Sequence, residues 1–125
     1  MAYLETLPDQ CPPAEALDQA FGPAYRFVDS SAFCVEQYYS HQRLGLPKPS
    51  TVDDCHYSSC SLFISKEAAE RIARMPKKRE TITHLAELHI PIGSGRSKFG
   101  KRQHVDFWMY DTFDVSTAIT GMFEL

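Results

Sequence analysis

The stretch "TITHLAELHIPIGSGRSKFGKRQHVDFWMY", residues 81–110, decides the fold because it contains two runs in which apolar and polar side chains alternate. The first run places Ala86, Leu88 and Ile90 on one face, and the second places Val105 and Phe107 on one face. Alternation with a period of two predicts two β-strands. Residues 93–103 between them are rich in Gly, Lys and Arg, so the sequence predicts a long-looped antiparallel hairpin.

The remaining segments predict helices early in the chain and further strands around this hairpin. Proline and glycine boundaries predict a helix over residues 13–21, helical spacing of aromatic residues predicts one after Ser30 or Ser31, and Ser65 caps a third over residues 65–75. Short strands are predicted at residues 24–29 and 60–65, and one more within residues 115–125. We therefore expect one α+β domain over residues 1–125, with a mixed or mainly antiparallel sheet of four to five strands and about three helices packed on it.

Composition is typical of a cytosolic single-domain protein. Of the 125 residues, 43% are hydrophobic, which is enough for one core. The amino end has neither a basic leader nor an apolar stretch, and no window approaches the length of a membrane span, so we expect no membrane partner.

Four cysteines are present: Cys11, Cys34, Cys55 and Cys60. In a reducing compartment they are expected to be free or ligating rather than disulfide-bonded, and Cys34 is expected to be a buried apolar residue. The stretch "CHYSSC", residues 55–60, also contains His56, but it lacks the paired C-x-x-C spacing of structural zinc sites. No metal site and no cofactor are predicted.

Positive charge is concentrated in the middle of the chain. Residues 71–104 contain nine Lys and Arg against two Asp and Glu, although the whole chain has a net charge of −3. Within this segment the loop of residues 93–103 could hold an anion through backbone N–H groups and four cationic side chains: Arg96, Lys98, Lys101 and Arg102. The loop does not match the Walker A pattern, since no Ser or Thr follows the Gly-Lys pair. The alternative is that these charges only solvate a helix face and a loop.

The strongest candidate site is one face of the second alternating run, which carries His104, Asp106, Trp108 and Tyr110. If the neighbouring strand turns Glu87 and His89 to the same side, the titratable groups form a cleft in which burial shifts their pKa values. The catalytic candidates are Glu87, His89, His104 and Asp106, while Trp108 and Tyr110 would bind ligand. The alternative is that the two aromatic side chains belong to the core.

A second candidate combines a buried cation with nearby hydroxyl groups. Arg26 lies inside the apolar strand "AYRFV", so it is either an internal ion-pair anchor or a ligand contact. Ser59 and Ser61 share one face of the strand beginning near Cys60 and complete the set of predicted ligand-binding residues.

Two resemblances are carried by these motifs. "SLFISKEAAERI", "AELHIPIGSG" and "HVDFWMYD" resemble, in order and spacing, small bacterial proteins of unknown function, and this resemblance implies no activity. More remotely, Arg26 followed by Ser59 or Ser61 is similar to the R-S-E arrangement of ADP-ribosyltransferases. That resemblance implies that these residues bind NAD and that a glutamate is catalytic, but the E-x-E or Q-x-E turn is absent and Glu124 lies close to the end of the chain.

The sequence thus predicts a small cytosolic bacterial accessory protein that binds an anionic ligand, either a nucleic acid or a phosphorylated small molecule, through the basic segment and the His/Asp/Trp face. One alternative is an ADP-ribosyltransferase-like or other nucleotide-using enzyme. Another is a homodimeric interaction module whose exposed aromatic residues would be Tyr38, Tyr39, Phe99 and Phe113.

Overall fold

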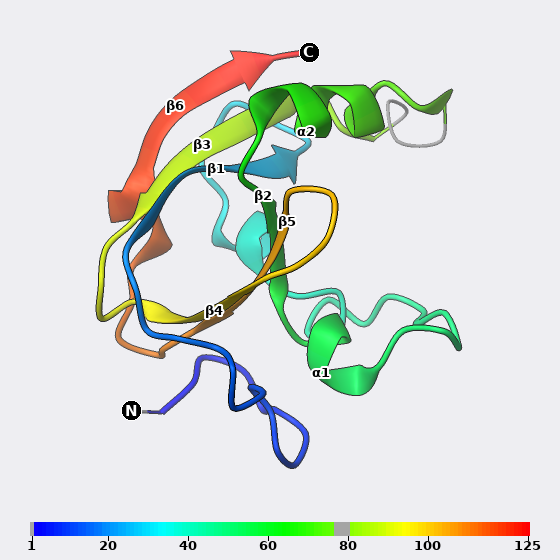
Figure 1. Cartoon of the computed structure of the whole chain (residues 1–125). Coiled ribbons are helices and arrows are strands. Elements are labelled where there is room, and N and C mark those ends of the chain that lie inside the picture. The colour runs from blue at the N-terminus through cyan, green and yellow to red at the C-terminus, as the bar shows by residue number, and fades with distance from the viewer. Residues whose placement is uncertain (1, 77–80) are drawn as a thin grey trace.

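The chain forms one antiparallel sheet of six strands (Figure 1). The structure is a computed structural model that describes residues 2–76 and 81–125. The strands are β1 (Phe21–Val28), β2 (Cys60–Phe63), β3 (His84–Ile90), β4 (Gly95–Phe99), β5 (His104–Met109) and β6 (Ile119–Glu124). Their order across the sheet is β4-β5-β2-β1-β3-β6. The helical elements are α1 (Asp54–Tyr57), α2 (Lys66–Ala73) and two 3₁₀ turns, η1 (Val35–Tyr38) and η2 (Val115–Ala118).

The expected arrangement of about three helices on a sheet of four to five strands is therefore wrong. Among the described residues, α2 is the only helix with seven or more residues. The helix expected at residues 13–21 is absent because the backbone of Leu17 pairs with Ser97 instead, through hydrogen bonds of 3.0 and 2.9 Å. Pairing with the exposed edge of β4 satisfies backbone groups that local helix propensity would otherwise have claimed.

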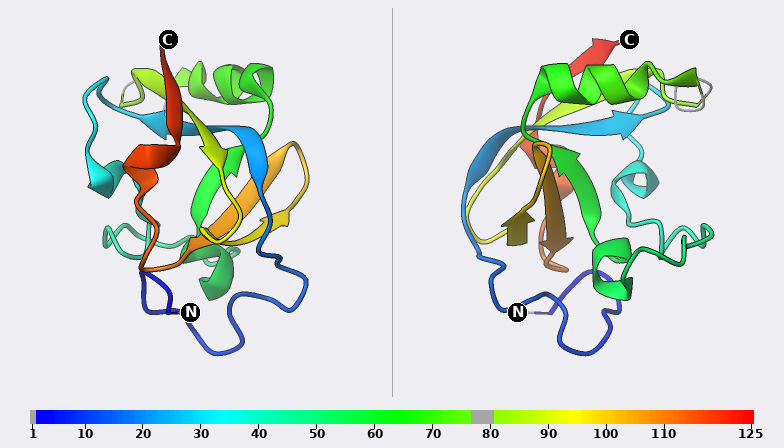
Figure 2. Two further views of the ribbon diagram at one scale, coloured as in Figure 1. Left: turned by 90° about the vertical axis from the view of Figure 1, so that its left-hand side faces the viewer. Right: turned by 45° about the vertical axis from the view of Figure 1, so that its right-hand side comes forward.

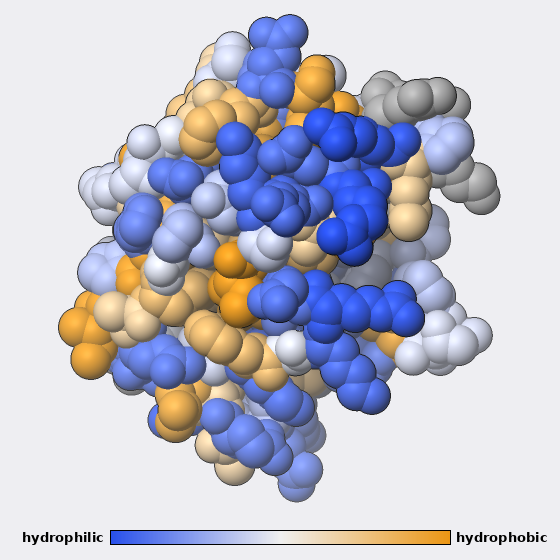
Figure 3. Space-filling model, turned by 45° about the horizontal axis from the view of Figure 1, so that its top comes forward, coloured by the Kyte–Doolittle hydropathy of each residue, from blue (hydrophilic) through white to orange (hydrophobic). Residues whose placement is uncertain are grey.

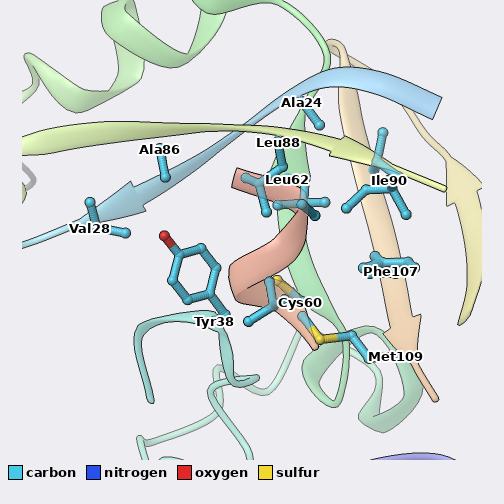
Figure 4. Packing of buried hydrophobic residues seen from close by; sticks show 13 residues of the cluster. Ala24, Val28, Tyr38, Cys60, Leu62, Ala86, Leu88, Ile90, Phe107 and Met109 are labelled. Carbon is cyan, nitrogen blue, oxygen red and sulfur yellow. The ribbon is translucent and has the colours of Figure 1, made fainter. Parts of the chain in front are cut away.

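The second expected helix is reduced to η1 because contacts with distant parts of the chain, rather than helical spacing, determine the backbone of this segment. Tyr38 is only 2% exposed, and its ring points into the core among Val28, Ala86 and Cys60 (Figure 4). The next residue but one, Ser40, donates both its backbone N–H and its hydroxyl to the carboxylate of Glu5. The turn ends at Tyr39, whose backbone is extended.

Helix α2 confirms the capping prediction. The hydroxyl of Ser65 accepts a hydrogen bond from the Ala68 N–H at 3.2 Å, which satisfies one of the free donors at the start of the helix. Ala69 is fully buried against Tyr25 and Leu85, on the outer side of β1 and β3. The helix thus covers one end of the sheet (Figures 1 and 2).

The predicted hairpin between residues 82–90 and 104–110 is also wrong, because the loop between them contains β4. Strands β4 and β5 form the hairpin, from Gly95↔Met109 to Phe99↔Val105, and β3 lies on the other side of β1 and β2. The buried positions of β4 are Gly95 and Ser97, which are too small to produce an apolar alternation. Gly95 is required there, since a Cβ atom would lie 2.2 Å from the carbonyl oxygen of Trp108.

The sheet is strongly curved, and its concave side encloses the core (Figures 2 and 4). The pairing of Leu17 with Ser97 brings the segment that leads into β1 alongside the edge of β4. The core contains the apolar residues that the alternating patterns placed on one face, among them Ala86, Leu88, Ile90, Val105, Phe107 and Met109. The predicted inward faces of these two strands are confirmed.

The expectation of free or ligating cysteines is wrong for two of the four. Cys11 and Cys55 form a disulfide that ties the N-terminal segment to α1, with 5.5 Å between their Cα atoms. Cys60 is free and buried, whereas Cys34 is free and exposed rather than buried. Spacing along the chain could not reveal the pairing, because it depends on how residues 2–18 fold back beneath the sheet.

Candidate functional site

A pocket opens where β1 and β2 diverge. The two strands are paired at Tyr25↔Phe63, and beyond this point the second half of β1 keeps only β3 as a partner. The resulting space has a volume of about 810 Å³. We call it the Arg26 pocket; it is lined by side chains from β1, β2, the η1 segment, α2 and β5, including Arg26, Phe27, Ser61, Phe63, Ile72 and His104.

Arg26 holds the diverging elements together. Its Nε donates to the carbonyl oxygen of Gln37, and its two terminal nitrogens donate to the carbonyl oxygens of Ser61 and Tyr39, each at 2.9 Å. These carbonyls belong to β2 and to the η1 segment, where no strand reaches them. The prediction of an ion-pair anchor is therefore wrong about the partner: Arg26 is held by three backbone carbonyls, and no described carboxylate pairs with it.

The charge of Arg26 is buried without an ion pair, although Asp29 and Glu36 line the same pocket. The residue is 8% exposed, and within the part of the chain that the structure describes no Asp or Glu forms an ion pair with it. A guanidinium has five N–H groups, and the three carbonyls take three of them. Two N–H groups therefore remain without a hydrogen-bond partner among the described residues, and Arg26 lines the pocket.

Beside the pocket lies a cluster of two histidines around one carboxylate, which we call the His–Asp–His cluster. Asp106 Oδ1 lies 2.8 Å from Nδ1 of His56 and 3.4 Å from Nδ1 of His104. This oxygen is buried, and its contacts with the two rings depart from regular hydrogen-bond geometry. His56 comes from α1, whose first turn is capped by Asp53.

The two histidines differ in their affinity for protons. Interaction of the His56 ring with the Asp106 carboxylate raises the pKa of His56, although partial burial opposes this. Burial lowers the pKa of His104, and the positive charges of His56 and Arg26 lower it further against the opposing pull of Asp106. At a given pH a larger fraction of His56 than of His104 is therefore protonated. Pairs of titratable groups whose pKa values are separated in this way are typical of acid–base sites.

The other two catalytic candidates do not join this cluster. Glu87 lies on β3, where it accepts hydrogen bonds from the hydroxyls of Tyr25 at 3.1 Å and Thr120 at 2.9 Å. His89 is exposed near the end of the same strand. Because β1 and β2 separate β3 from β5, the predicted convergence of Glu87 and His89 with His104 does not occur.

The aromatic residues of the predicted face are covered. Trp108 is 2% exposed and donates its indole N–H to the carbonyl oxygen of Cys55 at 3.1 Å. Tyr110 is buried and donates to Asp18 at 3.3 Å. The expected stacking surface on Trp108 is therefore not open to a ligand, because α1 and the N-terminal segment lie over this part of β5. Tyr38 and Phe113 of the interface alternative also pack in the core.

The two predicted serines separate. Ser59 is buried and donates its hydroxyl to the carbonyl oxygen of His56 at 2.7 Å, so it closes the turn after α1. Ser61 lines the Arg26 pocket. The cationic loop residues Lys98, Lys101 and Arg102 are exposed and Arg96 is half-buried. A largely hydrophilic surface interrupted by apolar side chains covers the side of the molecule shown in Figure 3.

Sequence reasoning missed several residues of the site. His56 was considered only as a metal ligand, and the pairing of β2 with β5 that brings it near Asp106 has no local signal. The pocket rim also contains Cys34, whose thiol donates to Glu36 at 2.7 Å. This contact raises the pKa of Cys34 and lowers that of Glu36. In residues 2–76 and 81–125, no group of three His, Cys, Asp or Glu side chains is placed to hold a metal ion.

Comparison of the chain with protein-family models, with curated proteins and with solved structures finds no match in any of the three. Among the described residues, no helix has both the length and the apolar character that crossing a membrane requires.

Proposed function

We propose that this protein binds a phosphorylated small molecule of nucleotide size in the Arg26 pocket. The observation that carries the proposal is the buried guanidinium of Arg26, which lines the pocket, lacks an ion-pair partner among the described residues and uses only three of its five N–H groups in hydrogen bonds to the protein. Burying an unpaired charge costs free energy, and an anion bound beside the charge offsets part of that cost. Arginine also binds phosphate oxygens with two parallel hydrogen bonds.

The walls of the pocket suit the rest of such a ligand. The rings of Phe27 and Phe63 lie 5.3 Å apart and provide an aromatic surface, and Ile72 and Leu46 add apolar contacts. The hydroxyl-bearing and amide side chains of Ser61 and Gln37 also line it. A volume of about 810 Å³ lies within the range of small-molecule sites, of the order of 300–1,000 Å³.

A small molecule is favoured over a nucleic acid because the concave, partly apolar site is distinct from the exposed cations. Lys98, Lys101 and Arg102 are at the surface, where water already solvates them, and the Trp108 ring that would have stacked on a base is buried. Binding by exposed loops alone would leave the charge of Arg26 uncompensated.

Isothermal titration calorimetry with ATP, ADP and AMP at low ionic strength tests the proposal. We expect saturable binding, which Arg26→Lys weakens about tenfold because an ammonium cannot reproduce the guanidinium fork. Ile72→Trp should abolish binding by filling the pocket, whereas Arg71→Gln on the exposed side of the same helix should leave the affinity unchanged.

Two results would contradict it. One is the lack of saturable binding by the folded protein with all three nucleotides. The other is binding that survives Ile72→Trp but is lost in a triple charge reversal of Lys98, Lys101 and Arg102, with steep salt dependence, which would place the anion on the β4–β5 hairpin.

One observation favours an ADP-ribosyltransferase-like activity as a second candidate. Arg26 and Ser61 line the same pocket, and Ser61 lies opposite Asp106 in the register of β2 and β5. The resemblance implies NAD as substrate and a catalytic carboxylate; Asp106 is the register partner of Ser61, whereas Glu124 lies on β6 at the far edge of the sheet. Release of nicotinamide from NAD, lost in Ser61→Ala, would support this candidate; no release above buffer would exclude it.

A further inference from the structure

We propose that His104 is a general base for hydrolysis of the phosphate group held in the Arg26 pocket. The inference rests on the proposed function, since it requires a phosphorylated ligand in this pocket. His104 is the residue that connects the two features of the site: it lines the pocket and it belongs to the His–Asp–His cluster.

The position of Asp106 favours one nitrogen of His104 as the proton acceptor. Nδ1 faces Asp106 at 3.4 Å, so a proton on Nδ1 is favoured by the carboxylate. In the neutral ring this leaves Nε2 unprotonated, as a proton acceptor. The ring of Phe63 packs edge-to-face with His104 at 5.3 Å and limits the orientations that the imidazole can adopt.

Three charged or titratable groups act on His104 from the elements around it: Asp106 on the same strand, His56 from α1 and Arg26 from β1. Burial and the two cations favour the neutral ring, which is the form that accepts a proton. Arg26 and His104 also line the same pocket, which is the geometric basis for placing a phosphate bound by Arg26 on the side of this ring.

The step balances with water as the only co-reactant. The water oxygen forms a bond to phosphorus, and the bond between phosphorus and the leaving oxygen breaks, with its electron pair remaining on that oxygen. Nε2 of His104 takes the proton from the attacking water and returns it to the leaving oxygen or to solvent. Arg26 stabilises the charge on the non-bridging oxygens of the phosphate. With ATP the products are ADP and inorganic phosphate.

His56 is a positioning residue in this arrangement. Its ring lies 2.8 Å from Asp106 and holds the carboxylate between the two imidazoles. Removing it also removes a positive charge that lowers the pKa of His104. A His56→Gln variant should therefore shift the rising limb of the pH–rate profile to higher pH, which a purely structural loss would not do.

The test measures inorganic phosphate released from ATP, ADP and AMP by ³¹P NMR, alongside calorimetric binding of the same nucleotides. We expect His104→Gln to bind ATP but to release phosphate about 100-fold more slowly, the usual contribution of a general base. His89→Gln, an exposed histidine on β3, is the matched control and should behave as wild type. Wild type, His104→Gln and His89→Gln are purified by the same procedure, so a contaminating phosphatase would release phosphate equally in all three samples.

The outcomes separate the two proposals. Nucleotide binding without phosphate release above buffer from any of the three would overturn the catalytic role of His104 and leave the proposed function standing. Absence of binding would overturn both. Undiminished release by His104→Gln would also refute the role. If that variant does not fold, the pH–rate profile of the wild-type protein decides. A neutral His104 base requires the rate of phosphate release to rise with pH around and below the ordinary imidazole pKa. A rate that does not rise in this range contradicts the proposed role.

Discussion

Replacing Arg26 with methionine should destabilise the protein by about 3–5 kcal/mol, the loss typical of buried charged groups that lose one side of their interactions. Methionine has a similar length but no donor. Three carbonyl oxygens, on Gln37, Tyr39 and Ser61, would then lose their 2.9 Å hydrogen bonds. Leaving a buried acceptor unsatisfied costs about 1–3 kcal/mol. Removing the buried charge of Arg26 also removes the cost of desolvating it, which reduces the net loss in the free energy of unfolding.

Such a loss is a large share of the ~5–15 kcal/mol by which small domains are stable. Urea denaturation followed by circular dichroism would measure it, with Arg71→Met as the control, because Arg71 is exposed on α2. Arg26→Lys should fall between the two, since one ammonium can reach some but not all of three separated carbonyls.

A different result would refute the anchoring role. If Arg26→Met unfolds at the same urea concentration as wild type, within about 0.5 kcal/mol, the three carbonyls find water or other donors without it. The divergence of β1 from β2 would then need another explanation.

Three further predictions follow from the fold and the cluster. Reduction of the disulfide, or the double change Cys11→Ser and Cys55→Ser, opens a loop of 44 residues and should lower the free energy of unfolding by about 4 kcal/mol on the chain-entropy model, as measured by urea denaturation. Gly95→Ala should cost about 2–3 kcal/mol and lower the melting temperature, because its Cβ would lie 2.2 Å from a backbone oxygen of β5. His56, whose pKa is raised, contributes stability that is complete below the ordinary pKa near 6.5 and is lost as the pH rises through its folded pKa. His104, whose pKa is lowered, contributes the opposite dependence, so stability is lost as the pH falls from about 6.5 through its folded pKa. Acidification should therefore destabilise His104→Gln less, and His56→Gln more, than wild type; equal pH dependence of all three in thermal melts would contradict the assigned directions.

The sequence predicted those elements whose signal is local. Ser65 and the apolar spacing after it are enough to specify α2, and the alternation through Ala86 and Phe107 is enough to specify the inward faces of β3 and β5. In each case the residue types that form the element are also those that pack it, so pattern and tertiary structure agree.

The failures occur where long-range pairing overrides local pattern. Strand β4 has Gly95 and Ser97 at its buried positions, so it has no apolar periodicity although it is fully paired with β5. The helix expected at residues 13–21 does not form because Leu17 pairs with Ser97, and these two residues are 80 positions apart in the chain. Neither outcome can be read from a window of neighbouring residues.

The candidate site was predictable only in its single residues. Arg26, His104 and Asp106 stood out because a cation or a titratable group in an apolar strand must find a partner, and Ser61 stood out because it shares a strand face with Ser59. Which of them meet depends on strand order. Strand β2 lies between β1 and β5, so these four residues gather near one end of the sheet. Glu87 lies on β3, which β1 and β2 separate from β5.

Arg26 resolves an alternative that the sequence left open, because anchoring and ligand binding do not exclude each other here. The three carbonyls fix the plane of the guanidinium before any ligand arrives. A ligand that uses the two remaining N–H groups therefore does not bear the conformational cost of ordering an arginine side chain, which is about 2 kcal/mol for a free one. The same bonds keep the cation in a pocket where no described carboxylate pairs with it, so the interactions that stabilise the divergence of β1 and β2 are also those that would prepare the site for an anion.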